Sequence, residues 1–176
     1  IFLVGNPDHA EIIASRSYAQ NVTVLYCTED VEKVPPSLGK TVVMCQTTLT
    51  RQKYDQIVSC LQKVYPDVKV MDTRCRPVRN QQEAVEALAT WVDGMVVLGG
   101  YESSNTTNLA RIASNFLGEK VWHVDRPDKI TAEMLEGLTT LGITGGTSTP
   151  RTQIEEAKSR IAQVFRGDVI YGQDKE

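Results

Sequence analysis

The chain has 176 residues, of which 41% are apolar, enough for one or two domains with a real core. Nineteen basic residues stand against 22 acidic ones, and no basic block could neutralise a run of phosphates, which argues against a nucleic-acid partner. No apolar run approaches the roughly 20 residues of a membrane span, and no signal region opens the sequence. We therefore expect a soluble, unsecreted globular protein with no membrane partner.

The elements expected along the chain alternate between strand and helix. Short runs rich in Val, Ile and Leu predict buried strands at 1–4, 22–26, 41–45, 68–71, 95–98, 120–124 and 140–144. Apolar residues at helical spacing predict helices within 54–64, 85–92, 109–116 and 154–165. This alternation is typical of α/β proteins with parallel sheets and three layers, which bind ligands at the carboxyl ends of the strands.

The two halves of the chain resemble each other. Residues 2–6 (Phe-Leu-Val-Gly-Asn) match 96–100 (Val-Val-Leu-Gly-Gly), 94 residues later. Residues 46–51 (Gln-Thr-Thr-Leu-Thr-Arg) match 146–151 (Gly-Thr-Ser-Thr-Pro-Arg), 100 residues later. We interpret this as two similar α/β units, 1–72 and 73–176, packed as a pseudo-symmetric pair.

Small hydroxyl and amide residues stand where predicted strands give way to helices, at 46–48, 103–105 and 147–149. The free N–H groups of a helix N-terminus can bind phosphate without Lys or Arg. The same residue types are also the favoured helix caps, so capping is the alternative for each cluster taken alone. Three clusters at equivalent strand ends favour one anionic pocket, with phosphate or diphosphate as its ligand.

His9 and Glu11 follow the first predicted strand. An imidazole and a carboxylate two residues apart could share a proton-delivery role. The alternative is a capping box in which Asp8 caps the helix, Glu11 is its third residue and His9 is merely exposed. His123 lies on an apolar strand and is interpreted as a core or edge residue.

The four cysteines lack CxxC pairing and are too sparse for a disulfide framework, so we expect mostly reduced thiols. Cys27, Cys45 and Cys60 are interpreted as small apolar residues. Cys75 differs, because it lies among three arginines ahead of a predicted helix, which predicts a lowered pKa and the thiolate form that binds metal or attacks an electrophile. No second Cys or His lies at structural zinc spacing, so other ligands of a metal must come from elsewhere.

Five motifs occur in register along the chain. They are Gly5-x-x-x-His9-Ala10-Glu11-Ile12; Gln46-Thr47-Thr48-Leu49; Asp72-Thr73-x-Cys75 with Asn80-x-Gln82 and Ala84; Gly99-x-x-x-Ser103-Ser104-Asn105-x-x-x-Leu109; and Gly-Ile-Thr-Gly-Gly-Thr-Ser-Thr-Pro at 142–150. From about residue 1 to 166 the chain resembles the LytB/IspH family, the 4-hydroxy-3-methylbut-2-enyl diphosphate reductases.

The resemblance implies three similar α/β domains around a 4Fe-4S iron–sulfur cluster held by three cysteines. Cys75 matches the third cysteine, and the other two are expected in an N-terminal domain missing ahead of Ile1. Among the catalytic residues, Glu11 matches the proton-delivering carboxylate. The residues that match substrate-binding positions are His9, Gln46, Thr47, Thr48, Ser103, Ser104, Asn105 and Ser148; of these, His9 and Thr47 also match catalytic positions.

The implied reaction removes the hydroxyl of an allylic diphosphate as water, giving isopentenyl and dimethylallyl diphosphate in the non-mevalonate pathway. A ferredoxin or flavodoxin would supply the electrons, in a bacterial cytoplasm or a plastid stroma. The chain departs from the family at Ala10, where proline is usual, and at Val78, where a pocket-lining threonine is common. The alternatives are a non-catalytic paralogue domain that binds a diphosphate or another phosphorylated small molecule, and an unrelated phosphosugar-binding or transferase domain.

Overall fold

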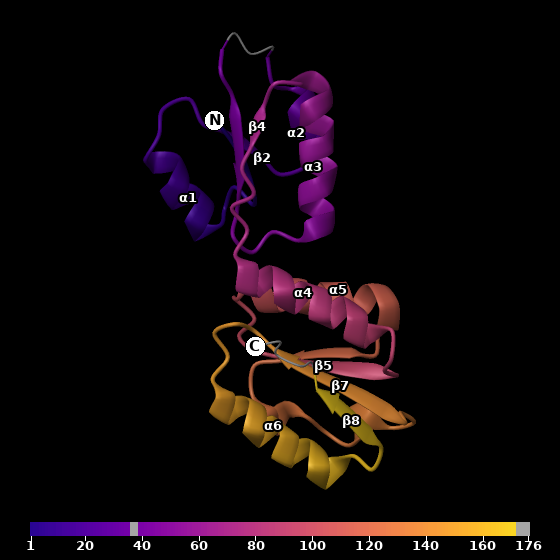
Figure 1. Ribbon diagram of the computed structural model, residues 1–176. Helices are drawn as coiled ribbons and strands as arrows, with labels where there is room; N and C mark the ends of the chain where they lie inside the picture. The colour runs from indigo at the N-terminus through magenta and orange to yellow at the C-terminus, as the bar shows by residue number, and fades with distance from the viewer. Residues whose placement is uncertain (36–38, 172–176) are drawn as a thin grey trace. The chain divides into compact units, whose positions relative to one another are not determined.

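The computed structural model describes residues 1–35 and 39–171. The chain folds into two compact units, Ile1–Arg76 and Pro77–Glu176, each with its own sheet and core (Figure 1). The expected boundary after residue 72 falls in the segment that joins the last strand of the first unit to the following helix. Within the described ranges no helix is long and apolar enough to cross a membrane.

The first unit is a parallel sheet of four strands with helices on both faces. Its elements are β1 (Phe2–Val4), α1 (Ala10–Ser17), β2 (Thr23–Leu25), α2 (Thr28–Glu32), β3 (Val42–Cys45), α3 (Arg51–Val64) and β4 (Lys69–Val70). The strand order is β2-β1-β3-β4, and every neighbouring pair is parallel. In Figure 1, α1 covers one face of this sheet, and α2 and α3 cover the other.

The second unit repeats the arrangement, with a helix ahead of its first strand and two 3₁₀ helices in place of the short α2. Its elements are α4 (Arg76–Ala89), β5 (Gly94–Leu98), α5 (Ser104–Leu117), β6 (Val121–Val124), the 3₁₀ helices η1 (Pro127–Lys129) and η2 (Glu133–Leu135), β7 (Thr140–Gly145), α6 (Arg151–Val164) and β8 (Asp168–Tyr171). The strand order is β6-β5-β7-β8, again all parallel. The α/β fold class predicted from the alternation is confirmed.

The internal repeat extends to the strand register. Phe2 of β1 pairs with Val43 of β3, and Val96 of β5, 94 residues after Phe2, pairs with Ile143 of β7, 100 residues after Val43. The helices that follow, α3 and α6, both have 14 residues and also begin 100 residues apart. The two sequence matches at separations of 94 and 100 residues therefore mark the two central strands of each sheet.

Alternate residues of the central strand β5 face two different cores. Met95 and Val97 pack with the apolar faces of α4 and α5, whereas Val96 and Leu98 pack with α6. A strand buried on both faces must be apolar at every position, so β5 reads as an unbroken apolar run.

Apart from the two short 3₁₀ helices η1 and η2, two elements were not predicted, and both are weakly marked in the sequence. The helix α2 has only five residues and buries only Val31. The strand β8 lies at a sheet edge, with Asp168, Ile170 and Tyr171 exposed, and its apolar run is only three residues long, 169–171. The edge interpretation of His123 is confirmed, because β6 is the other edge strand of that sheet.

Candidate active site on two sets of strand-end loops

The carboxylate of Glu11 binds Thr47 through both of its oxygens. Oε1 accepts the backbone N–H of Thr47 at 2.8 Å, and Oε2 accepts the Thr47 hydroxyl at 2.8 Å. Glu11 lies in the first turn of α1, which follows β1, and Thr47 lies in the loop after β3; these two parallel strands are neighbours, and their carboxyl ends meet at one sheet edge. The structure thus brings together an acid group and a hydroxyl that sequence reasoning had placed 36 residues apart.

The capping-box alternative for this loop is wrong. His9, not Asp8, is the N-cap of α1, and its Nδ1 accepts the backbone N–H of Glu11 at 3.2 Å. The backbone N–H of Asp8 instead donates to the side chain of Asn6 at 3.1 Å. Since the imidazole caps the helix, the Glu11 side chain is left to turn toward Thr47.

Gln46 links the same two loops from a buried position. Its Oε1 accepts the backbone N–H of Asn6 at 3.0 Å, and its Nε2 donates to the Thr48 hydroxyl at 2.9 Å. A side chain at Gly5 would not fit, since a Cβ there would lie 2.9 Å from Cβ of Gln46 and 2.5 Å from Cδ1 of Ile12. The glycine of the first motif therefore has a packing role in positioning this loop.

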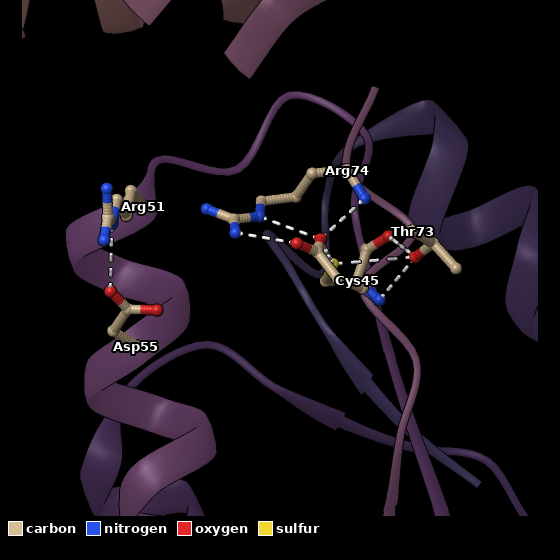
Figure 2. A network of polar contacts seen from close by, with 6 residues as sticks. Cys45, Arg51, Asp55, Thr73 and Arg74 are labelled. Atoms are coloured by element: carbon tan, nitrogen blue, oxygen red, sulfur yellow. Dashed lines mark hydrogen bonds and ion pairs between the residues drawn. The ribbon is translucent and has the colours of Figure 1, made fainter. Parts of the chain in front are cut away.

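Cys75 lies beside Thr47, as a half-buried free thiol just ahead of α4. Its backbone N–H donates to the Thr47 carbonyl at 2.9 Å. Thr73 positions this segment, because its hydroxyl contacts both the N–H (2.8 Å) and the carbonyl (2.6 Å) of Cys45 at the end of β3 (Figure 2). The hydrogen bonds therefore join Glu11, Thr47 and Cys75 into one group.

Arg74 does not direct its charge toward Cys75. Its Nε and Nη2 bind the two oxygens of Asp72 at 2.9 and 2.8 Å (Figure 2). Its guanidinium lies 4.2 Å from the ring centre of Tyr54. The hydrogen bond to Asp72 raises the pKa of this guanidinium. Arg74, one of the three arginines on which the predicted Cys75 thiolate rests, is thus paired with Asp72 instead. The thiolate form of Cys75 stays a prediction.

The other cysteines lie in three different settings. Cys45 is buried in the core, and burial raises the pKa of its thiol. Cys60 packs against the same core, as predicted. Cys27 departs from its interpretation as a small apolar residue, because it is the N-cap of α2, where its backbone N–H and thiol both contact a carboxylate oxygen of Asp30.

In the second unit, the serine cluster forms the N-terminus of α5. Ser103 is the N-cap, and its Oγ accepts the N–H of Thr106 at 3.3 Å and the Thr106 hydroxyl at 3.0 Å. Ser104 and Asn105 form the first turn, and Asn105 is only 4% exposed. The Oδ1 atom of Asn105 has no hydrogen-bond partner within the described part of the chain.

The capping alternative holds for only one of the three polar clusters. Ser103 caps α5, but the N-caps of α3 and α6 are Thr50 and Pro150, and neither helix has a side-chain cap hydrogen bond. In the third cluster the Thr149 hydroxyl donates to the Leu98 carbonyl at 3.0 Å. The residues at 46–48 and 147–149 therefore need another explanation than capping.

Two glycines let α5 approach the strand ends. Gly99 has φ +145°, and a Cβ there would lie 2.9 Å from the hydroxyl oxygens of Thr106 and Thr149. A Cβ at Gly146 would lie 2.4 Å from the Thr106 hydroxyl. Ser148 follows as an exposed residue in the turn before α6. The structure thus sets the Ser103 turn against the carboxyl end of β7, from which the Ser148 loop departs.

Sequence reasoning missed Gln81 as a site residue. It lies on α4, and its side-chain oxygen accepts from Nδ2 of Asn105 at 2.9 Å. The only signal was its place within the cysteine motif, where it reads as one of several polar residues on a helix.

A cavity of about 690 Å³ lies in the second unit. It is lined by residues from 132–133, 135–139 and 164–168, at the amino ends of β7 and β8. Ligands of parallel α/β sheets bind at the carboxyl ends, and the cavity includes none of the predicted site residues, so we assign it no role in the site.

The residues that the described part of the chain brings together include no group of three or more His, Cys, Asp or Glu side chains that could hold a metal ion. A cluster held by three cysteines therefore does not form from these residues alone. Cys75, free and half-buried just ahead of α4, fits as one ligand of such a cluster.

Comparison with known proteins gives relatives over nearly the whole chain. The 4-hydroxy-3-methylbut-2-enyl diphosphate reductases of Caldanaerobacter subterraneus and Geotalea daltonii are both 34% identical, over 92% and 94% of this chain. The chain spans only 56% and 58% of the length of those relatives.

Solved structures agree with this result. A structure titled as (E)-4-hydroxy-3-methyl-but-2-enyl diphosphate reductase, the terminal enzyme of the non-mevalonate pathway, is 30% identical over 93% of the chain and 59% of its own, with a TM-score of 0.54. The reductase from Plasmodium falciparum, 20% identical, shares the fold with a TM-score of 0.90 over 99% of the chain and 56% of its own. Because a model of the LytB protein family also matches residues 1–162, this chain belongs to the LytB family.

Proposed function

We propose that the chain forms the substrate-binding part of a 4-hydroxy-3-methylbut-2-enyl diphosphate reductase. The observation that carries the proposal is the group of Glu11, Thr47 and Cys75, which combines an acid, a hydroxyl and a thiol at one sheet edge. The reaction consumes two electrons and two protons, breaks the carbon–oxygen bond of the allylic hydroxyl and releases water. Its products are isopentenyl and dimethylallyl diphosphate.

The Glu11–Thr47 pair supports a proton route to the substrate hydroxyl. The Thr47 hydroxyl donates to Glu11, so its lone pairs are left to accept the hydroxyl of a substrate. When Glu11 is protonated, it can pass its proton to Oγ1 of Thr47 while Thr47 passes its own to the substrate oxygen. Glu11 ends as a carboxylate, Thr47 is unchanged, and the substrate oxygen leaves as water.

His9 is suited to donate to a diphosphate oxygen. Its Nδ1 accepts the Glu11 N–H and therefore carries no proton, so the proton of the neutral ring is on Nε2. We assign the remaining diphosphate contacts to Ser103, Ser104, Asn105 and Ser148. The N-terminus of the 14-residue α5 supports this, because its N–H groups attract anions without a basic side chain.

We assign Cys75 as one thiolate ligand of an iron–sulfur cluster of the 4Fe-4S type, which supplies the electrons when bound. Two further cysteines would come from the N-terminal domain that completes the protein. The half-buried Val42 and Met44 of β3 support a further packing partner, because the equivalent strand β7 of the second unit is covered by α4. We further propose ferredoxin or flavodoxin as the electron donor and a bacterial cytoplasm or plastid stroma as the location.

Val78 supports a second candidate, a paralogue that binds a diphosphate without reducing it. It is buried on α4, three residues after Cys75, and its side chain cannot donate a hydrogen bond to a ligand. Under this hypothesis the Ser103 and Ser148 loops still bind a diphosphate, and Glu11 does not act as an acid.

Iron content and turnover of the whole protein test the proposal. We expect the purified protein to bind iron, to convert 4-hydroxy-3-methylbut-2-enyl diphosphate with a reduced viologen as donor, and to lose most of its iron on Cys75→Ser. The control is Cys60→Ser, which changes a thiol packed against the core and should keep the iron. Diphosphate binding without turnover in an iron-loaded protein would favour the paralogue, and normal iron in Cys75→Ser would reject the ligand assignment.

A further inference from the structure

A row of amide hydrogen bonds links α4 to the first turn of α5 and to the end of β7. Nδ2 of Asn105 donates to Oε1 of Gln81 at 2.9 Å. Nε2 of Gln81 in turn donates to the carbonyl of Gly145, the last residue of β7. Gln81 is half-buried and Asn105 is buried, so both bonds are shielded from water.

Gly145 fixes the direction of the whole row. A backbone carbonyl only accepts, so the amide nitrogen of Gln81 must face it, and Oε1 must then face Asn105. An amide oxygen also only accepts, so Asn105 must turn its nitrogen toward Gln81. The orientation of the Asn105 amide, which its own surroundings would leave open, is thereby set from a strand end.

The orientation leaves two groups of Asn105 for a ligand. Its Oδ1 is buried with no hydrogen-bond partner among residues 1–35 and 39–171, and its second N–H is not used by Gln81. A buried amide oxygen without a donor is unfavourable, which is typical of a group that meets its partner only when a ligand binds. Ser103 caps the same helix end, so both groups lie in the turn to which we assign the diphosphate.

We propose that Gln81 is a positioning residue that orients Asn105 for its contact with a diphosphate-bearing ligand. The inference rests on the proposed function, since it takes the α5 turn as the diphosphate site. Gln81 itself touches no ligand. It determines which atoms of Asn105 do.

The test is a double-mutant cycle with inorganic diphosphate as the probe, measured by calorimetry on the whole chain. We expect Gln81→Leu to weaken binding about 3- to 10-fold, the range for one neutral hydrogen bond. In an Asn105→Ala background the same change should have no further effect, because Gln81 acts only through Asn105. Gln81→Met, which keeps the side-chain length, guards against misfolding, and Glu83→Leu, an exposed change on the same helix, is the control.

A second readout is the side-chain amide resonance of Asn105, which should shift in Gln81→Leu and stay unchanged in Glu83→Leu. Unchanged affinity in Gln81→Leu, or an equal loss of affinity in the Asn105→Ala background, would overturn the positioning role. If the wild-type chain binds no diphosphate, the proposed function fails, and the resonance still decides whether Gln81 orients Asn105. A resonance that does not move overturns the inference in either case.

Discussion

Replacing Glu11 by Gln separates the acid role of this residue from its structural role. The carboxylate accepts two hydrogen bonds from Thr47, one from the N–H and one from the hydroxyl, both 2.8 Å long. Glutamine keeps one acceptor oxygen for the N–H and offers an NH₂ group to the hydroxyl. The Thr47 hydroxyl can rotate and accept from this group, so we expect both contacts to survive with the second bond reversed.

The expected loss of stability is small and the expected loss of turnover is large. Two charge-assisted bonds become neutral ones, a difference of about 1 kcal/mol for a half-buried pair. The amide has no proton to give, so kcat should fall about 10²- to 10⁴-fold, the usual contribution of a general acid. Substrate affinity should change by no more than a few-fold. The absorption spectrum of the cluster should stay unchanged.

The assay is steady-state turnover of the whole protein with a reduced viologen, alongside urea denaturation. Glu29→Gln is the matched control, because it makes the same charge change at an exposed position on α2. A kcat of Glu11→Gln within threefold of wild type would refute the proton route. A loss of stability well above 2 kcal/mol would refute the proposed reversal of the Thr47 bond.

Three further predictions test the frame around the site. Gly146→Ala should lower the free energy of unfolding by about 1–3 kcal/mol in urea denaturation, because the new Cβ would lie 2.4 Å from the Thr106 hydroxyl. The control Gly100→Ala should leave it unchanged, because nothing lies within 4 Å of a Cβ there. Ser148→Ala should weaken binding of inorganic diphosphate about 10- to 150-fold, the equivalent of one hydrogen bond to a charged group, and unchanged affinity would remove this contact. Hydrogen bonds from backbone N–H groups lower the pKa of Asp30 from 3.8 to about 2. The ionised carboxylate therefore contributes its full stabilisation above about pH 4, and this contribution is lost as the pH falls toward 2. In Asp30→Asn this part of the pH dependence of the free energy of unfolding should vanish.

Much of the fold could be predicted from local sequence patterns, and the elements that were not predicted lack such a pattern. The central strand β5 is apolar at every position because helices cover both of its faces, so 95–98 could be predicted from composition alone. The edge strand β8 offers an apolar run of only three residues, 169–171, which is too short a signal to mark a strand. The helix α2 is too short for a periodic pattern.

The candidate site was predictable as a set of loops but not as a set of contacts. Parallel pairing of β1 and β3 implies that residues near 9–11 and 46–48 meet at one edge. That Glu11 takes both donors of Thr47 depends on His9 capping α1, whereas the sequence favoured Asp8 as the cap. Gln81 could not be found this way, because a polar residue on a helix gives no sign of whether it faces water or a second amide.

The equivalence of the two units does not carry over to their loops, and one position shows why. Gln46 and Gly146 occupy the same place in the repeat, and each donates its backbone N–H to the last residue of the neighbouring strand, at 2.8 and 3.0 Å. The side chain of Gln46 then accepts a hydrogen bond from the backbone N–H of Asn6, which ties the loop ahead of Glu11 to the end of β3. Gly146 has no side chain and so leaves room for Thr106, which lets the N-terminus of α5 lie close to the carboxyl end of β7. The same backbone arrangement thus holds Glu11 in place in the first unit and brings a helix N-terminus to the strand end in the second, which suits the proposed protonation of a hydroxyl and the proposed binding of a diphosphate.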